Sequence, residues 1–159
     1  MAQLVKAENR SKDQLVWVVE LQSSAEKVYD FYKKKCYEFP KIMPLVLLKV
    51  ELVSGERNCV GSVRRWTFVD DKCGSLKDTV EAINDEEKSI TWALLDGEVL
   101  KKLYKSLKVE YQFTAKDKGC TATVTLTFEK KGDGFPEPAK CGEVIKSMLL
   151  AVDAYLLTH

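Results

Sequence analysis

The sequence predicts an α+β fold in which a curved antiparallel sheet of seven strands wraps around one long C-terminal helix. Residues 144–156 place apolar side chains at the i, i+3, i+4, i+7 spacing of a single helical face. Residues 46–130 show instead the two-residue alternation of strands, with short turns rich in Gly, Asp and Asn between them. Short connections favour an antiparallel meander, and one face of such a sheet can curl around a helix.

The long helix is predicted over residues 136–159, with Pro136 and Pro138 at its entry. About 20 helical residues span ~30 Å, the width of a small domain. We therefore expect a ligand to lie against the apolar face of this helix. The apolar face is formed by Val144, Ile145, Met148, Leu149, Val152, Tyr155 and Leu156, and the polar face by Lys140, Glu143, Lys146, Ser147 and Asp153.

The first part of the chain predicts a strand over residues 15–22, which are rich in β-branched and aromatic side chains. Ser23 and Glu26 have the spacing of a capping box, which starts a helix. Pro40 and Pro44 then interrupt further helix, and a short second helix is expected near them. The apolar stripe of the first helix comprises Val28, Phe31, Tyr32 and Cys36.

Six more strands fit between the turns, at residues 47–53, 60–69, 75–84, 89–95, about 103–114, and 120–130. In the last of them Ala122, Val124, Leu126 and Phe128 share one face, and threonines occupy the other. The same alternation places Ile90, Trp92 and Leu94 together, and Arg64 with Trp66 and Phe68.

Two positions leave alternatives open. In strand 103–114 the alternation turns Leu107, Val109, Tyr111 and Phe113 inward, whereas a single bulge would present Lys108 and Glu110 instead. Arg64 has inward parity, so its guanidinium must reach a partner, the rim or a ligand oxygen, since an unpaired buried charge is strongly destabilising. We favour the rim for Arg64.

Composition excludes several classes of function. The 159 residues suffice for one domain, and 25 basic against 24 acidic residues give a net charge of +1, which argues against nucleic-acid binding. No apolar run is long enough to span a bilayer, and the N-terminus lacks the apolar region of a secretory signal, so a cytoplasmic protein is expected. The five cysteines are dispersed and the single histidine is terminal, which predicts reduced thiols and neither a metal site nor cysteine–histidine catalysis.

Several segments resemble the birch pollen allergen superfamily of plant proteins. They are EFPKIMP, VSGERNCVGSVRRWTF and the ending LLAVDAYLLTH, and the resemblance spans nearly the whole chain. Within the superfamily, GSVRRW, ITWALLDGEV and LKKLYKSLKVEYQF resemble the major latex protein-like branch. The segment GERNCVG departs from the family, because it keeps only Gly55 and Gly61 where relatives carry a glycine-rich loop.

The resemblance implies the helix-grip fold, in which a seven-stranded sheet holds the long helix and two short helices close an internal cavity. Members of this family bind apolar or amphipathic plant metabolites, and some are cofactor-free enzymes, such as norcoclaurine synthase. Carried over residue by residue, the resemblance implies these ligand-binding residues: Phe31, Trp66, Phe68, Ile90, Trp92, Leu94, Val144, Ile145, Met148 and Val152. Arg64 joins this predicted set through its inward parity alone.

Three residues are candidates for catalysis. Asp96 matches an acidic residue of the catalytic set of norcoclaurine synthase, although an aspartate before Gly97 is also typical of an ordinary turn. Lys108 could act as an acid or imine-forming group, but we favour a solvated strand position for it and for Glu110. Tyr111 could donate a hydrogen bond, and packing in the core is the favoured role.

Two functions are compatible with these features. The first is a carrier or storage protein that binds a small hydrophobic or amphipathic plant metabolite, without cofactor or metal, as a monomer or weak dimer. The second is a cofactor-free cyclase or isomerase of monoterpenoid, iridoid or alkaloid intermediates that acts in the same cavity. Such a reaction needs mainly a pre-organised pocket that excludes solvent. Binding is favoured, because the sequence places no acid–base pair inside the cavity.

Overall fold

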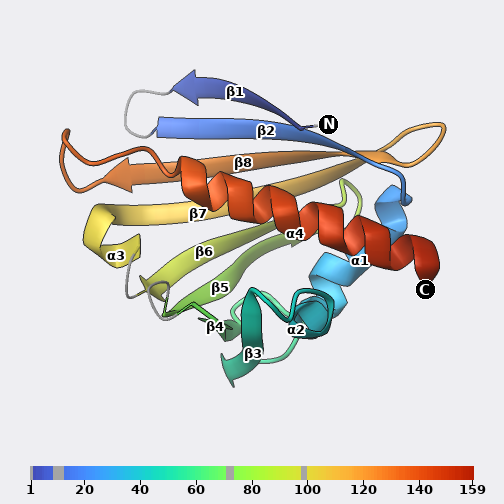
Figure 1. Cartoon of the computed structure of the whole chain (residues 1–159), viewed down its shortest axis with the longest axis horizontal. Helices are drawn as coiled ribbons and strands as arrows, with labels where there is room; N and C mark the ends of the chain where they lie inside the picture. The colour runs from blue at the N-terminus through green and yellow to red at the C-terminus, as the bar shows by residue number, and fades with distance from the viewer. Residues whose placement is uncertain (1, 9–12, 71–73, 98–99) are drawn as a thin grey trace.

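The computed structural model describes residues 2–8, 13–70, 74–97 and 100–159, whose strands form one curved antiparallel sheet (Figure 1). The strand order is β1-β2-β8-β7-β6-β5-β4-β3. In chain order the elements are β1 (Ala2–Glu8), β2 (Asp13–Leu21), α1 (Ala25–Lys34), the 3₁₀ helix η1 (Cys36–Glu38), α2 (Phe39–Ile42), β3 (Leu47–Ser54), β4 (Val63–Phe68), β5 (Ser75–Asn84), β6 (Ser89–Gly97), α3 (Leu100–Leu103), β7 (Tyr104–Ala115), β8 (Cys120–Lys130) and α4 (Ala139–Thr158).

The helix-grip fold predicted from the sequence is confirmed. The long helix α4 lies across one face of the sheet, and α1, η1 and α2 gather beside its C-terminal end (Figure 1). All seven predicted strands are present, and two of them, β5 and β8, have the predicted bounds. The inner face of the sheet and α4 therefore enclose the region in which a ligand was expected.

An eighth strand, β1, extends the sheet beyond the seven that were predicted. It pairs antiparallel with β2, from Ala2 opposite Val19 to Glu8 opposite Asp13. The segment AQLVKAE contains one β-branched residue, so its own propensity for a strand is weak. The backbone hydrogen bonds offered by β2 supply what the local sequence lacks, and they cover an edge that would otherwise be open.

The start of α1 differs by one residue from the predicted capping box. Ser24, not Ser23, is the N-cap, and its Oγ accepts a hydrogen bond from the N–H of Lys27 at 3.2 Å. Ser23 is instead buried against α4, where its N–H donates to Asp153 Oδ1 at 2.8 Å while Gln22 N–H donates to Oδ2 at 3.0 Å. Asp153 therefore lies on the buried side of α4 and not on its polar face. Its carboxylate satisfies two backbone donors of the β2–α1 turn.

The core lies between α4 and the inner face of the sheet. Along β8 the inward side chains are all buried and the threonines between them face outward, as the alternation predicts. Gly142 brings the first turns of α4 close to β2, since a Cβ atom at this position would lie 2.0 Å from the indole ring of Trp17. The helix docks through Gly142, Met148, Leu149, Val152 and Asp153, which are buried.

Candidate functional site

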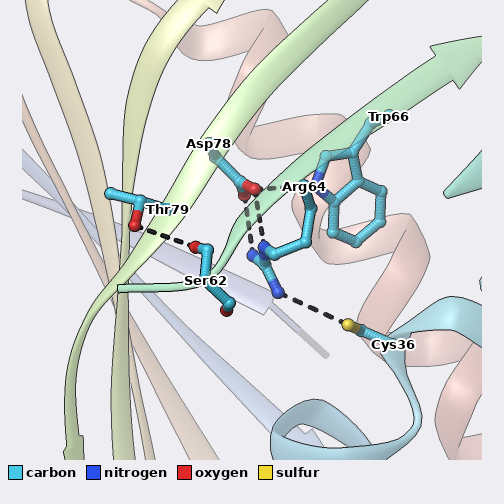
Figure 2. Close-up of polar contacts among 6 residues, drawn as sticks. All are labelled: Cys36, Ser62, Arg64, Trp66, Asp78 and Thr79. Carbon is cyan, nitrogen blue, oxygen red and sulfur yellow. Dashed lines mark hydrogen bonds and ion pairs between the residues drawn. The ribbon is translucent and has the colours of Figure 1, made fainter. Parts of the chain in front are cut away.

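Arg64 and Asp78 form a buried ion pair on the inner face of β4 and β5 (Figure 2). Arg64 Nε donates to Asp78 Oδ1 and Arg64 Nη2 to Oδ2, both at 2.8 Å, which is the bidentate geometry of a strong charge-assisted pair. The two residues are register partners on adjacent strands, so the backbone pairing itself sets them opposite each other. Arg64 is only 2% exposed, so the rim position predicted for it is wrong. A carboxylate on the next strand makes the buried position possible.

Further contacts fix the ion pair in place. Trp66 Nε1 donates to Asp78 Oδ1 at 3.0 Å, and Arg64 Nη1 donates to the sulfur of Cys36 at 3.4 Å (Figure 2). The guanidinium also lies over the ring of Trp92, with Cζ 4.4 Å from the ring centroid, a cation–π contact. The Asp78 carboxylate thus accepts three hydrogen bonds from side chains.

Electrostatics at the site follow from burial and from this pairing. Burial acts to lower the pKa of Arg64, but the charge of Asp78 and its hydrogen bonds outweigh burial and hold the pKa above its ordinary value. Burial raises the pKa of the Cys36 thiol to about 11, so the sulfur beside Arg64 is protonated at neutral pH. The site therefore contains one cation, one anion and a neutral thiol.

Aromatic rings surround the ion pair and fill the space between the short helices and the sheet. Tyr32 lies 4.7 Å from Tyr111 between ring centroids, Trp92 lies 5.1 Å from Tyr111, and Trp66 lies 5.5 Å from Trp92. Elements far apart in the chain supply these rings: α1, α2, β4, β6 and β7. We call this group the aromatic cluster, and its members are Tyr32, Phe39, Trp66, Trp92, Tyr111 and Phe113.

Two polar atoms inside the aromatic cluster have no hydrogen-bond partner among the described residues. They are the hydroxyl oxygen of Tyr32 and Nε1 of Trp92, which belong to stacked rings 5.6 Å apart. Tyr32 is completely buried and Trp92 is 4% exposed. A buried polar group without a partner costs about 1–3 kcal/mol, so each such atom in a folded protein calls for an explanation.

The tyrosine hydroxyls of the cluster remain protonated over the physiological range. Burial, followed by the influence of Tyr111 and Cys36, raises the pKa of Tyr32 well above its ordinary value. Burial and then Asp78 likewise raise the pKa of Tyr111. Both groups are therefore neutral hydroxyls that can donate a hydrogen bond and not phenolate bases.

The structure places most of the predicted ligand-binding residues on the inner face, and contact with a ligand stays a prediction for each. Val144 is an exception: it is 40% exposed on α4, because the helix turns Gly142 and Met148 inward instead. Phe68, Leu94 and Ile145 are half-buried against the core. The fully inward set is Phe31, Arg64, Trp66, Ile90, Trp92, Met148 and Val152.

The three candidate catalytic residues do not meet. Tyr111 is buried in the aromatic cluster, which favours the plain alternation from Leu107 to Phe113. The one register shift in the pairing of β7 with β8 lies earlier, between Tyr104 and Ser106. Lys108 lies on the outer face, where its Nζ pairs with Glu81 at 3.1 Å. Asp96 is exposed at the end of β6, and it lines a surface hollow of about 280 Å³ together with Arg65 and Lys77. A catalytic role for any of them stays a prediction.

Four site residues have roles that the sequence did not predict: Asp78 and Cys36 at the ion pair, and Tyr32 and Phe39 in the aromatic cluster. Asp78 has the same parity as Val80 in β5, which places it on the inner face. It lies on the strand that follows the strand of Arg64 in the chain. An inward arginine and an inward carboxylate on consecutive strands were thus a signal available in the sequence. Cys36 was expected only as part of an apolar stripe, and its contact with Arg64 depends on how η1 packs.

Within the described ranges, no group of three or more His, Cys, Asp and Glu side chains is arranged to hold a metal ion. In the same part of the chain, no helix is both long and apolar enough to cross a membrane.

Comparison with known proteins identifies the family. The sequence pattern of the pathogenesis-related protein Bet v 1 family matches residues 11–159, which leaves β1 outside the matched region. The chain belongs to the Bet v 1 family. Allergen Pet c 1 of Petroselinum crispum is 30% identical over 149 residues, covering 89% of this chain and 97% of the allergen. MLP-like protein 328 of Arabidopsis thaliana is 28% identical over 140 residues, covering 87% and 92%. These relatives support the major latex protein-like branch of the Bet v 1 family.

Solved structures of Bet v 1 relatives have the same fold. The major latex-like protein 151 of Panax ginseng superposes with a TM-score of 0.84 at 22% identity, covering 92% of this chain and 98% of the ginseng chain. Norcoclaurine synthase of Thalictrum flavum, in complex with dopamine and hydroxybenzaldehyde, gives a TM-score of 0.73 at 18% identity, covering 99% and 98%. The Bet v 1 fold fits ligand binding in a cavity.

Proposed function

We propose that the protein binds a small hydrophobic plant metabolite, as a carrier or storage protein, between α1, α4 and the inner face of the sheet. The observation that carries this proposal is the aromatic cluster with its unpartnered Tyr32 hydroxyl and Trp92 N–H. Small-molecule sites combine largely apolar walls with a few well-placed polar groups, and this cluster has that composition.

Binding requires the rings of the aromatic cluster to separate, because they fill the space in the described structure. Tyr32 and Phe39 come from α1 and from α2, a helix of only 4 residues, and they contact Tyr111 and Trp66 on the strands. Both rings are fully buried, so the binding free energy of the ligand must exceed the free-energy cost of moving them. The complex of norcoclaurine synthase with two small aromatic molecules supports this proposal, since that protein shares the fold.

A cofactor-free cyclase or isomerase acting in the same space is the alternative. It is favoured by the surplus of hydrogen-bond donors near Trp92, because donors fixed in a dry site stabilise an oxygen on which negative charge develops. Among the candidate catalytic residues, Tyr111 lies in this region, and its raised pKa suits a donor better than a base. Lys108 on the outer face has no place in this alternative.

Mass spectrometry of the protein incubated with a plant metabolite extract tests both functions. A retained, chemically unchanged apolar compound that is lost in Trp92→Ala supports the carrier, provided that thermal unfolding shows the variant to be folded. Lys108→Met, altered on the outer face, is the matched control and should retain the compound. A new product that requires the intact protein favours the enzyme. If the protein retains no compound and forms no product, the proposed function is contradicted.

A further inference from the structure

We propose that the bound metabolite carries an acceptor oxygen, such as a carbonyl, that receives hydrogen bonds from Trp92 Nε1 and the Tyr32 hydroxyl, and that the site discriminates against cationic amines. This inference rests on the proposed function and specifies the chemistry of its ligand. It is based on the balance of donors and acceptors around the Arg64–Asp78 pair.

The buried carboxylates near the site are already engaged by protein donors. Asp78 accepts from Arg64 Nε, Arg64 Nη2 and Trp66 Nε1, at 2.8, 2.8 and 3.0 Å. Asp153 is the other carboxylate among the buried described residues, and it is held by the backbone N–H groups of Gln22 and Ser23. A ligand ammonium would thus find no carboxylate to pair with, and it would lie near the Arg64 guanidinium.

Donors, by contrast, remain in surplus. The indole N–H of Trp92 can only donate, and it has no partner in the part of the chain that the structure describes. The Tyr32 ring stacks beside it, and the hydroxyl of Tyr32, which can donate its O–H, likewise lacks a partner among the described residues. Arg64 Nη1 donates to the sulfur of Cys36 at 3.4 Å, and sulfur is a weak acceptor.

The oxygen that fits this site is neutral. The charge of Arg64 is balanced by Asp78, so an anionic ligand would gain no free cation and would lose its hydration. A ketone, aldehyde or enol oxygen accepts hydrogen bonds without that desolvation cost. A hydrocarbon of the same shape would leave both donors unpaired. Sites that hydrogen-bond a ligand discriminate strongly against an analogue that lacks the bonding group, so the hydrocarbon should bind more weakly.

Three probes of one shape test the inference by equilibrium dialysis: 2-acetylnaphthalene, 2-isopropenylnaphthalene and 1-(2-naphthyl)ethylamine. They present an acceptor oxygen, a methylene group and an ammonium group, respectively, on the same skeleton. We expect the ketone to bind at least about tenfold more tightly than the hydrocarbon, the equivalent of one or two net hydrogen bonds, and the amine to bind most weakly.

Two variants locate the effect. In Tyr32→Phe and in Trp92→Phe the preference for the ketone should shrink to about threefold or less, while affinity for the hydrocarbon is unchanged. Tyr32→Phe should also keep the urea midpoint of the wild type, because the deleted hydroxyl has no partner in the free protein. A lower midpoint would show that the hydroxyl is already satisfied, by water for example, and would overturn the inference.

A ketone that does not bind, or that binds no more tightly than the hydrocarbon, overturns the inference in the same way. The proposed function is judged separately, by retention of compounds from the plant extract. The two can therefore fail independently.

Discussion

The inner and outer faces of the same strands place identical residue types in different physical states. Arg64 and Arg65 are neighbours on β4, yet Arg64 is 2% exposed and pairs with Asp78, whereas the Arg65 side chain is 37% exposed and bonds Glu51 at 3.2 Å. The side chains of an exposed ion pair are hydrated whether or not they pair, so the pair contributes little to the free energy of unfolding. In a buried ion pair, removal of one partner leaves the other as an unpaired charge away from water, which is strongly destabilising.

The comparison extends to β7. Its outward Lys108 forms a solvated ion pair with Glu81, while its inward Tyr111 lies in the aromatic cluster with a raised pKa. The neutral groups of the site whose pKa values are raised by burial, Cys36, Tyr32 and Tyr111, thus lie on the inner face. An exposed carboxylate such as Glu51 has its pKa lowered instead, by the hydrogen bond that it accepts from Lys49 and by its contact with Arg65. Groups whose protonation is set by their surroundings are those from which functional sites are built.

The largest expected effect separates the two arginines. Arg64→Met leaves the Asp78 charge buried without its partner and should lower the free energy of unfolding by about 3–5 kcal/mol. Arg65→Met should lower it by less than about 1 kcal/mol, because its ion pair is exposed. Urea unfolding at pH 7 measures both, and equal losses would contradict the distinction between the faces.

A second effect concerns the thiols and alkaline pH. The folded pKa of Cys36, about 11, is raised above its ordinary value of 9.0, so the unfolded chain loses this proton first as the pH rises. The contribution of the protonated Cys36 thiol to the free energy of unfolding is complete below pH 9 and is lost as the pH rises toward 11. Between pH 8 and pH 10.5 the free energy of unfolding, measured with urea, should therefore fall by about 2 kcal/mol more in the wild type than in Cys36→Ser. Cys59→Ser, altered at an exposed cysteine, serves as control and should follow the wild type.

A third effect tests how closely α4 approaches the inner face. Alanine favours a helix over glycine by ~1 kcal/mol, but the Cβ of Gly142→Ala would meet the Trp17 ring at 2.0 Å. We expect a net loss of about 1–2 kcal/mol, since overpacking outweighs propensity. Gly132→Ala has open space around its Cβ and should leave thermal unfolding nearly unchanged. A stabilised Gly142→Ala would show that α4 sits farther from β2.

The smallest effect is expected on the outer face. Lys108→Met removes an exposed ion pair whose two side chains are 41% and 45% exposed, so the free energy of unfolding should change by less than ~0.5 kcal/mol. Its retention of metabolites should equal that of the wild type. A loss of turnover in this variant, measured on any product that the wild type forms, would restore Lys108 as a catalytic candidate.

The periodicity of apolar residues predicted most of the fold, and particular residues show which features it did not predict. The alternation in β8 and the i, i+3, i+4 spacing in α4 gave the correct elements, because burial of one face is written directly into the order of side chains. Asp153 and Val144 were assigned to the wrong sides, because a helix with apolar residues on more than one side can rotate to satisfy a polar contact. The strand β1 was missed because its partner, not its own composition, stabilises it.

The sequence by itself determined seven of the eight described strands, the long helix and the inward parity of Arg64, Trp66 and Trp92, since these depend on local spacing. Its segments also resembled the family that the comparison then identified, whereas the register that turns Tyr111 inward was left open. Only the tertiary structure decided that Arg64 is paired with Asp78 and that Tyr32 and Trp92 keep unpartnered polar atoms. Pairing and its absence are properties of side chains brought together from different elements. No periodicity within one element can specify which donor will meet which acceptor.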